Sequence, residues 1–295
     1  MAPFPAMGNS FAAIQWREGI SGGANARQAG TARSRRRPGL GMDLLVRDGA
    51  VGDQAANLAL EEALARAGPR APVLRIWQNA SCVVIGRAQR PAREVNLAAC
   101  TASGVPVLRR ASGGGTVYQD LGNLNVSMAV PGRAPGLAAE VAALVAAVIA
   151  GLGLAPSAGE RGVFVGPAKV SGLASQLTRV GSLAHATLLV TTPAARVGAF
   201  LTPAPAEHHP ADSRRSPVAS LRDLGCDLGV AAARGAVLAE AARRYGPPRR
   251  RAPSAAERRW QRRLLAERYR MDSWHLTGRT EEAQWTTRPV LTCTG

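Results

Sequence analysis

Two short segments of this sequence combine residue types that can hold a negatively charged ligand. The first is RRASGGGTVY at residues 109–118, where three consecutive glycines follow two arginines. Glycines leave backbone N–H groups unobstructed, so these groups can turn toward phosphate or carboxylate oxygens as an anion-binding nest. Arg109 and Arg110 would add fork-shaped cationic donors at the edge of that nest. The segment matches neither a Walker A motif nor the GxGxxG motif, so it predicts a different type of anion site.

The second segment contains the only lysine of the chain. All but one of the 37 basic residues are arginine, and the exception is Lys169. A guanidinium replaces an ammonium wherever only charge or a long stem is needed, but it cannot supply a compact point charge. Lys169 lies between apolar residues in the segment AKVSG. We therefore interpret Lys169 as a residue that neutralises an acyl phosphate as charge develops on it.

Two further motifs accompany these segments. IGRAQ at residues 85–89 is followed closely by EVN at 94–96, and HATLL occupies residues 185–189. A single histidine before a strand is more often structural than catalytic. The residues alone therefore leave the role of His185 open.

The composition is that of a folded globular protein. Of the 295 residues, 46% are hydrophobic and 19% are charged, which argues against a disordered chain. No apolar run approaches the roughly twenty residues of a membrane span. The four cysteines show no CxxC spacing, so they predict neither a zinc site nor a disulfide framework and fit a reducing compartment. We expect a cytoplasmic protein with no membrane partner.

The positive charge is concentrated at two places. The formal net charge is +17, and residues 1–41 and 243–270 carry most of the excess arginine. Such flanks can bind nucleic acid through phosphate groups, but no known nucleic-acid-binding motif accompanies them. The pattern therefore favours a solvated surface or a patch for an acidic protein over a nucleic-acid partner.

Periodicity and turn signals predict the elements that must position these motifs. Asp53 is a helix N-cap and Gly68 a stop, and apolar spacing predicts a second helix over 137–152. The other predicted elements are strands at 73–77, 82–85, 105–110, 116–119, 124–130 and 187–191, helices at 194–201, 230–245 and 255–269, and a loop at 202–217. Strands and helices are mixed, not strictly alternating, which predicts an α+β fold with helices on one side of its sheet. Residues 1–41 are expected to be a disordered extension, and 276–295 a tail.

Taken in order, IGRAQ…EVN, RRASGGGTVYQDLGN, AKVSG and HATLLV closely resemble the motifs of the lipoate-protein ligase A group of the biotin/lipoate protein ligase superfamily. The resemblance is clear from about residue 42 to 190. Further along, ERYRMDSWHLTG, with Trp274 and His275, resembles the segment that closes the family's catalytic domain. The resemblance implies a biotin/lipoate ligase-like catalytic domain over residues 42–275, with a mixed sheet flanked by helices.

Members of this family activate lipoate or octanoate with ATP as an acyl adenylate and then transfer the acyl group to a lysine of a carrier domain. The resemblance implies that Lys169 is the catalytic residue, holding the carbonyl and phosphate oxygens of the adenylate. It implies substrate binding by Arg110, Ser112, Gly113, Gly114, Gly115 and His185. It implies nucleotide binding by Gly115, Asn123, Asn125 and Lys169. It identifies no metal ligand.

The resemblance also implies substrates and partners. Mg²⁺ and ATP are expected as a complex, with lipoate as the acyl substrate. The expected carriers are lipoyl domains of 2-oxoacid dehydrogenase complexes or the glycine cleavage carrier protein. Because such carriers are typically acidic, the arginines near 243–270 are a candidate docking face. We expect no C-terminal accessory domain of the family's usual kind after residue 275, so participation of a separate accessory subunit stays open.

Three positions depart from the family pattern. Gln119 replaces a common histidine, Gly162 lies near a common Asn-Asp pair, and Ala186 replaces a glycine. An octanoyl or lipoyl transferase of the same fold, taking a carrier-bound acyl group or a preformed acyl adenylate, is an alternative. The relatives of that class that use a thioester carry a cysteine before the lysine motif, and residues 155–169 contain none, which favours adenylate chemistry. A non-catalytic lipoate- or nucleic-acid-binding protein is the second alternative.

Overall fold

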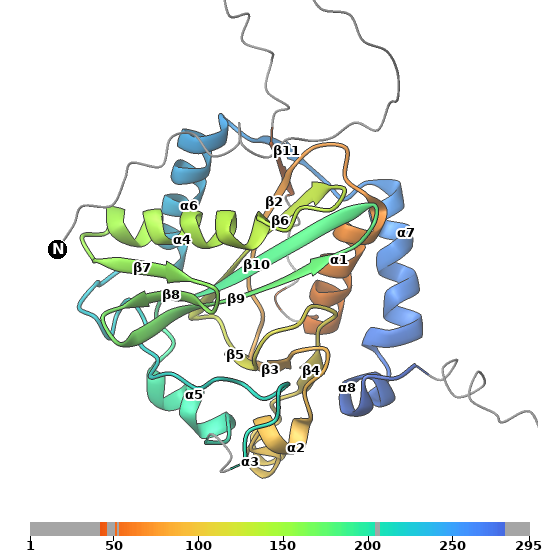
Figure 1. Cartoon of the computed structure of the whole chain (residues 1–295), viewed down its shortest axis with the longest axis vertical. Helices are drawn as coiled ribbons and strands as arrows, with labels where there is room; N and C mark the ends of the chain where they lie inside the picture. The colour runs from red at the N-terminus through yellow and green to blue at the C-terminus, as the bar shows by residue number, and fades with distance from the viewer. Residues whose placement is uncertain (1–41, 46–50, 52, 204–206, 281–295) are drawn as a thin grey trace, which may run out of the picture.

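Residues 42–45, 51, 53–203 and 207–280 are described by the computed structural model of the protein (Figure 1). The extension predicted at 1–41 and most of the predicted tail lie outside the described residues. The central element is a mixed eight-stranded sheet. Its strands in spatial order are β11 (Arg249–Arg251), β1 (Asp43–Leu45), β2 (Val73–Trp77), β6 (Asn123–Pro131), β10 (Gly181–Leu189), β9 (Ala168–Leu177), β8 (Gly162–Val165) and β7 (Pro156–Gly159). A second sheet has the order β4 (Val107–Arg109), β3 (Cys82–Ile85) and β5 (Val117–Gln119).

The antiparallel pair β6 and β10 forms the buried centre of the large sheet. Leu124, Val126 and Met128 of β6 point toward one face and pack into the main apolar core. The alternate side chains include Asn125 and Ser127, which point to the other face because successive strand residues alternate. In the register, Asn125 lies opposite Thr187 and Ser127 lies opposite His185. The strand pattern thus places four polar side chains together on one face.

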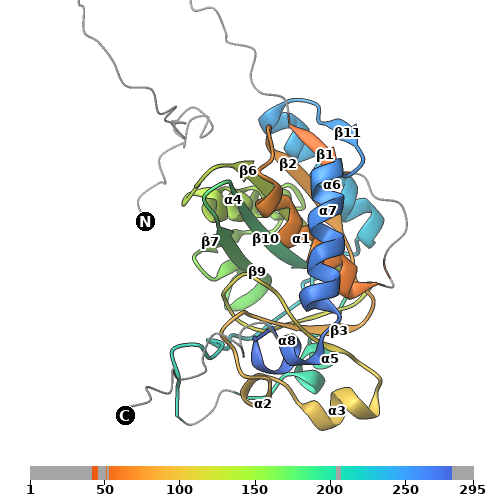
Figure 2. The same cartoon turned by 90° about the vertical axis from the view of Figure 1, so that its right-hand side faces the viewer.

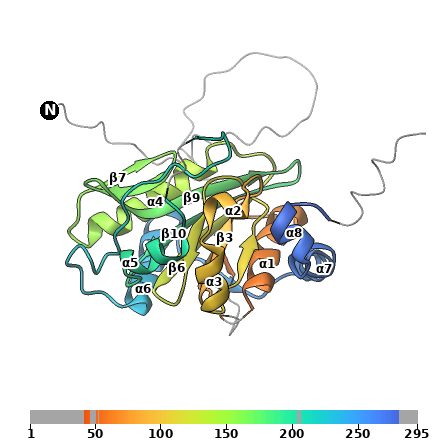
Figure 3. The ribbon, with the colours of Figure 1, turned by 90° about the horizontal axis from the view of Figure 1, so that it is seen from below.

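Helices cover both faces of this sheet. On the apolar face lie α4 (Leu137–Gly151) and α6 (Val230–Tyr245), and on the other lie α1 (Gln54–Ala67) and α7 (Ala255–Leu264), as Figure 3 shows. The prediction that helices lie on one side only is wrong. The second face of the sheet also carries apolar residues that a helix must bury, because Ala129 and Leu183 pack there against Leu60 and Leu64 of α1. The predicted mixed sheet flanked by helices is confirmed.

Helix α1 begins and ends where the sequence predicts. The Asp53 carboxylate accepts a hydrogen bond from the Ala56 N–H at 2.8 Å, which caps the first turn. Gly68 ends the helix with a φ of +63°, in the left-handed region that favours glycine. This helix carries Glu61 and Glu62 toward the centre of the molecule, where both are buried.

Several elements differ from their predictions. Strand β10 begins at Gly181, so His185 lies inside a strand and not before one. The apolar runs around Lys169 form the hairpins of β7, β8 and β9, and Lys169 lies near the start of β9. The four short helices are α2 (Pro91–Glu94), α3 (Leu97–Ala102), α5 (Ala194–Phe200) and α8 (Asp272–Thr277). The predicted helix at 255–269 is α7 followed by a π-helical turn, η2 (Leu265–Tyr269).

Part of the basic segment 243–270 stabilises the fold. Arg251 of β11 donates hydrogen bonds to the carboxylates of Asp43 and Glu257, and Arg268 pairs with buried Glu62 at 2.6 Å. Helix α7 packs along the outer side of α1 (Figure 2). The arginines left exposed on α7 are Arg258, Arg259, Arg262 and Arg263. Within the described residues, no helix is both long enough and apolar enough to cross a bilayer.

Candidate functional site

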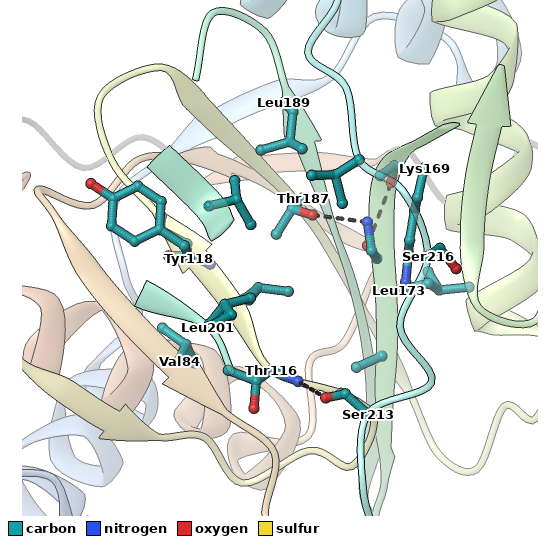
Figure 4. Close-up of a pocket in the computed structure, with 18 of the residues that line it drawn as sticks. Val84, Thr116, Tyr118, Lys169, Leu173, Thr187, Leu189, Leu201, Ser213 and Ser216 are labelled. Atoms are coloured by element: carbon teal, nitrogen blue, oxygen red, sulfur yellow. Dashed lines mark hydrogen bonds between the residues drawn. The ribbon is translucent and has the colours of Figure 1, made fainter. Parts of the chain in front are cut away.

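A cavity of about 530 Å³ opens between the glycine-rich segment, strands β9 and β10, and the segment that follows α5. Its volume is in the range of small-molecule sites. We call residues 207–218 the strap; its residues 213–218 form one wall (Figure 4). Much of the remaining lining is apolar and includes Leu58, Trp77, Val84, Leu173, Leu189 and Leu201. The cavity therefore joins an apolar surface to a polar, basic end.

Five of the predicted site residues line this one cavity. They are Arg110, Gly115, Asn125, Lys169 and His185. Ser112 lies directly behind His185, with its Oγ 2.9 Å from His185 Nε2. Gly113, Gly114 and Asn123 are not among the lining residues of the described chain. Segments more than 120 residues apart in sequence are thus brought to one site, as when Glu61 of α1 contacts His185.

Arg110 supports the glycine loop from within. Its guanidinium donates to the carbonyl oxygens of Gly113 at 2.6 Å, Gly115 at 2.7 Å and Val84 at 3.1 Å, and to Ser112 Oγ at 3.0 Å. Burial lowers the pKa of Arg110 to about 10. Although Arg110 lines the cavity, most of its donors bind the loop itself, so its principal structural effect is to fix the loop's shape.

Arg109 points away from the glycine loop. Its guanidinium donates to six backbone carbonyl oxygens, three from residues 86–89 and three from residues 274–276. The Trp274 indole N–H donates a hydrogen bond to the Arg109 carbonyl at 2.9 Å. The prediction that Arg109 lies at the edge of an anion nest is wrong, because consecutive strand residues project to opposite faces. Arg109 instead joins the C-terminal helix α8 to the IGRAQ segment.

Close backbone packing explains the glycine of the IGRAQ motif. A Cβ atom at Gly86 would collide with the carbonyl oxygen of Gly114. Gly114 itself has a φ of +78°, which disfavours any residue with a side chain. The two motifs, separated in sequence, therefore pack backbone to backbone.

His185 is held between a carboxylate and a hydroxyl group. Its Nδ1 lies 3.3 Å from Glu61 Oε2, and Glu61 also accepts from Arg75 at 2.8 Å and from Ser127 at 2.6 Å. Burial raises the pKa of Glu61, but hydrogen bonding by His185 and the charge of Arg75 outweigh it, so the pKa lies below its usual value. Since Arg110 Nε donates to Ser112 Oγ, the Ser112 hydroxyl is free to donate to His185 Nε2. The network fixes the plane of the imidazole ring.

The predicted nucleotide residues belong to a buried amide cluster. The Gln119 amide donates to Asn125 Oδ1 at 2.9 Å, and Asn123 donates to the same oxygen at 3.3 Å. No group of three or more His, Cys, Asp or Glu side chains suited to a metal occurs in the described residues. These side chains do not fit a resident Mg²⁺ ion, which prefers carboxylate ligands.

Lys169 provides the isolated positive charge that its sequence context predicts. Its backbone N–H donates to the Pro217 carbonyl at 2.8 Å, so the strap runs beside it. No carboxylate of the described chain lies within ion-pair distance of its ammonium group. Burial lowers the pKa of Lys169 to about 8, with further contributions from the charges of Arg161 and Arg110. Every charged side chain in the cavity lining is cationic, so the described site is suited to an anion.

Two parts of the site were missed by sequence reasoning. The first is Ser213, whose Oγ accepts from the Thr116 N–H at 2.8 Å and donates to Glu94 Oε2 at 2.6 Å, as Figure 4 shows for Thr116. The prediction of a loop at 202–217 identified the segment but not this contact. The second is Glu61, whose signal was available as a pair of acids within the apolar repeat of residues 54–67.

Comparison with known proteins identifies the family of this chain. Residues 53–242 match the family model described as the lipoyl protein ligase A/B catalytic domain. Because this match covers more than half of the chain, the protein belongs to that family.

Individual proteins are also similar to this chain. A bi-partite lipoate protein ligase of Thermoplasma acidophilum, described in a structural study with its E2 lipoyl domain, has 27% identity and a TM-score of 0.68, covering 80% of this chain and 96% of that one. A lipoate-protein ligase A bound with ATP has 25% identity and a TM-score of 0.71, covering 80% and 98%. A protein of Aeropyrum pernix named "Putative lipoate-protein ligase A" is 40% identical over 153 residues, which is 50% of this chain and 58% of that protein. The match spans little more than half the length of that relative. The predicted fold and family are confirmed.

Proposed function

We propose that this protein is a lipoate-protein ligase. It activates lipoate or octanoate with ATP and transfers the acyl group to a lysine of a lipoyl carrier domain. The observation that carries the proposal is the position of Lys169, a half-buried cation without a carboxylate partner among the described residues, at the basic end of a mostly apolar cavity.

The site chemistry fits two successive transfers. In the first, a carboxylate oxygen of the acid attacks the α-phosphorus of ATP, and the bond to the leaving pyrophosphate breaks. In the second, the amine of the carrier lysine attacks the acyl carbonyl, a proton leaves the nitrogen, and AMP departs. Lys169 stabilises negative charge on the carbonyl and phosphate oxygens in both steps, because a compact ammonium in a partly buried site interacts strongly with developing charge.

The apolar wall is the proposed acyl site. Trp77, Val84 and Leu173 offer the surface that an eight-carbon chain needs, and burial of such a chain contributes about 0.8 kcal/mol per CH₂ group. Arg110, Ser112 and the glycines 113–115 shape the polar boundary of this region. We assign His185 to the same substrate-binding wall and Asn125, with Asn123 behind it, to the nucleotide side.

The cysteine-dependent transferase is the weaker alternative. Among the described residues, no cysteine lines the cavity. Cys82 is fully buried, and burial raises the pKa of its thiol to about 12, so it is a poor source of the thiolate that forms an acyl-enzyme. These facts favour adenylate chemistry, in which the carrier lysine is the nucleophile.

The catalytic unit proposed here extends from residue 42 to 275. Its C-terminal part is included because Arg109 and Trp274 join α8 to the glycine-rich region. Lipoyl carriers of 2-oxoacid dehydrogenase complexes or the glycine cleavage carrier protein are the proposed partners, in the cytoplasm. The bi-partite ligase among the relatives supports a separate accessory subunit as a further partner, and this chain alone is proposed to carry the catalytic site.

The test is lipoate-dependent pyrophosphate release by the purified chain with Mg-ATP, followed by acylation of an added lipoyl domain. Lys169→Ala should reduce release by about 100- to 1000-fold, as expected when a preorganised charge-stabilising group is lost. Lys169→Arg is the matched variant that keeps charge but not compactness. Acylation from an acylated carrier without ATP, at equal rates in wild type and Lys169→Ala, would contradict the proposal.

A further inference from the structure

The tight turn between β7 and β8 brings an arginine close to Lys169. The hairpin closes with the pair Gly159 and Gly162, which leaves a two-residue loop containing Arg161. Gly162 has a φ of +133°, and a Cβ atom there would collide with the carbonyl oxygen of Ser171 on β9. Only glycine permits this close approach, so the backbone at the turn fixes Arg161 beside the middle of β9, at Ser171 and Gly172.

Two contacts hold the Arg161 guanidinium at the rim of the cavity. Its NH1 donates to Ser216 Oγ at 3.2 Å, and its Cζ lies 5.4 Å from the ring centre of Phe164. Ser216 lines the cavity and lies beside Lys169 in Figure 4. Arg161 is nevertheless exposed, so its remaining N–H groups are accessible to a ligand.

On its cavity side, Arg161 faces no negative charge, although the exposed Glu160 is its neighbour in the two-residue loop. The charged residues of the described cavity lining are Arg110, Lys169, Arg214 and Arg215, with no Asp or Glu among them. Arg215 pairs with Glu94, and Arg110 binds backbone carbonyls, whereas Lys169 has no such partner. After burial, the charge of Arg161 is the largest cause that lowers the pKa of Lys169. Two cations placed together are unfavourable in the free protein and become favourable when an anion binds between them.

We propose that Arg161 binds the outer phosphates of ATP at the mouth of the cavity. This inference rests on the proposed function, which places the α-phosphate at Lys169. Arg161 lies farther out, at the exposed rim, where the β- and γ-phosphates extend from a nucleotide bound in this way. A guanidinium matches phosphate oxygens with two parallel hydrogen bonds. It supplies positive charge at a site whose described residues contain no carboxylate cluster for a resident metal ion.

The test compares Mg-ATP and AMP binding to the full chain by calorimetry, together with KM values for ATP and lipoate. Arg161→Gln should weaken ATP binding and raise KM for ATP by about five- to tenfold, the loss expected for one exposed charge-assisted contact. AMP binding, KM for lipoate and acyl transfer from preformed lipoyl adenylate should change by less than about twofold, because they do not involve the outer phosphates. Arg161→Lys should recover part of the loss.

Arg179→Gln is the matched control. Arg179 is also an exposed hairpin arginine, but it follows the other end of β9, roughly 30 Å from Lys169 by strand rise. Unchanged ATP binding by a folded Arg161→Gln protein would overturn the proposal while leaving the ligase function intact. Equal losses for ATP and AMP would overturn the assignment to the outer phosphates. Absence of both ATP binding and pyrophosphate release in wild type would overturn the proposed function and this inference together.

Discussion

Two cationic regions of this molecule use positive charge in opposite ways. In one, the guanidinium of Arg109 is buried and donates to six backbone carbonyl oxygens, and Arg110 donates to three more. In the other, Lys169 lines the cavity and Arg161 lies at its rim on Ser216, and neither has a carboxylate ion-pair partner among the described residues. The paired arginines therefore build the wall of the site, whereas the charge available to a ligand lies at Lys169.

The largest effect on stability is expected for Arg109→Met. Loss of the guanidinium leaves buried carbonyl oxygens without donors and disconnects α8 from the glycine-rich region. The free energy of unfolding should fall by about 3–5 kcal/mol, because several buried carbonyl oxygens lose a donor at roughly 1–3 kcal/mol for each acceptor left unsatisfied. Urea denaturation measures this loss as a lower urea concentration at the midpoint of unfolding. A loss below about 1 kcal/mol, similar to that of exposed Arg179→Met, would show that Arg109 does not hold the fold.

Lys169→Met is the opposite case. It removes an unpaired cation, so the free energy of unfolding should change by less than about 1 kcal/mol, even as catalysis is lost. The same urea titration tests this, beside pyrophosphate release. A destabilisation as large as that of Arg109→Met would mean that Lys169 supports the fold, and the contrast between the two regions would fail.

Ser213→Ala should give an intermediate effect by separating the strap from the glycine loop. The Thr116 N–H and the Gln89 side-chain amide both donate to Ser213 Oγ and would lose that acceptor. The expected cost is about 1–3 kcal/mol. Proteolysis within 207–218, compared between wild type and variant, reports the local loosening. Equal cleavage rates in the two proteins would contradict the assigned contact.

The pH dependence of kcat/KM for ATP tests the charge of Lys169. Because the pKa of this lysine is about 8 in the free protein, raising the pH above 8 removes its charge and should reduce kcat/KM. Arg161→Gln removes a like charge and should therefore shift this decline of kcat/KM to higher pH. In Lys169→Arg, this decline of kcat/KM at high pH should be absent. If kcat/KM declined over the same pH range in Arg161→Gln as in wild type, Arg161 would not act on Lys169.

The smallest effect is expected for charge reversal of the exposed arginines on α7. Replacing Arg258, Arg259, Arg262 and Arg263 by Glu should raise KM for an acidic lipoyl domain at low salt and leave KM for lipoate unchanged. The difference from wild type should shrink as ionic strength rises. If wild type and the charge-reversed variant had identical KM values for the carrier at low salt, α7 would not belong to the docking face.

Local signals were enough to predict part of this molecule. The N-cap at Asp53 and the stop at Gly68 defined α1, and the uniqueness of Lys169 in the sequence indicated a residue that lines the described cavity. Strand β11 could not be predicted, because three arginines form a strand only through pairing with β1. The link between Glu61 and His185 depends on contacts between distant segments, which no local pattern encodes. The opposite directions of Arg109 and Arg110 were accessible from strand alternation and were overlooked.

Formation of an acyl adenylate at Lys169 can be observed by mass spectrometry of the products formed from lipoate and Mg-ATP without a carrier domain, in wild type and Lys169→Met. We expect lipoyl-AMP in wild type, its near absence in the variant, and its consumption when a lipoyl domain is added. Lipoylation of the domain by wild type from an acylated carrier, with no lipoyl-AMP detected at any time, would show that this cavity does not form an adenylate.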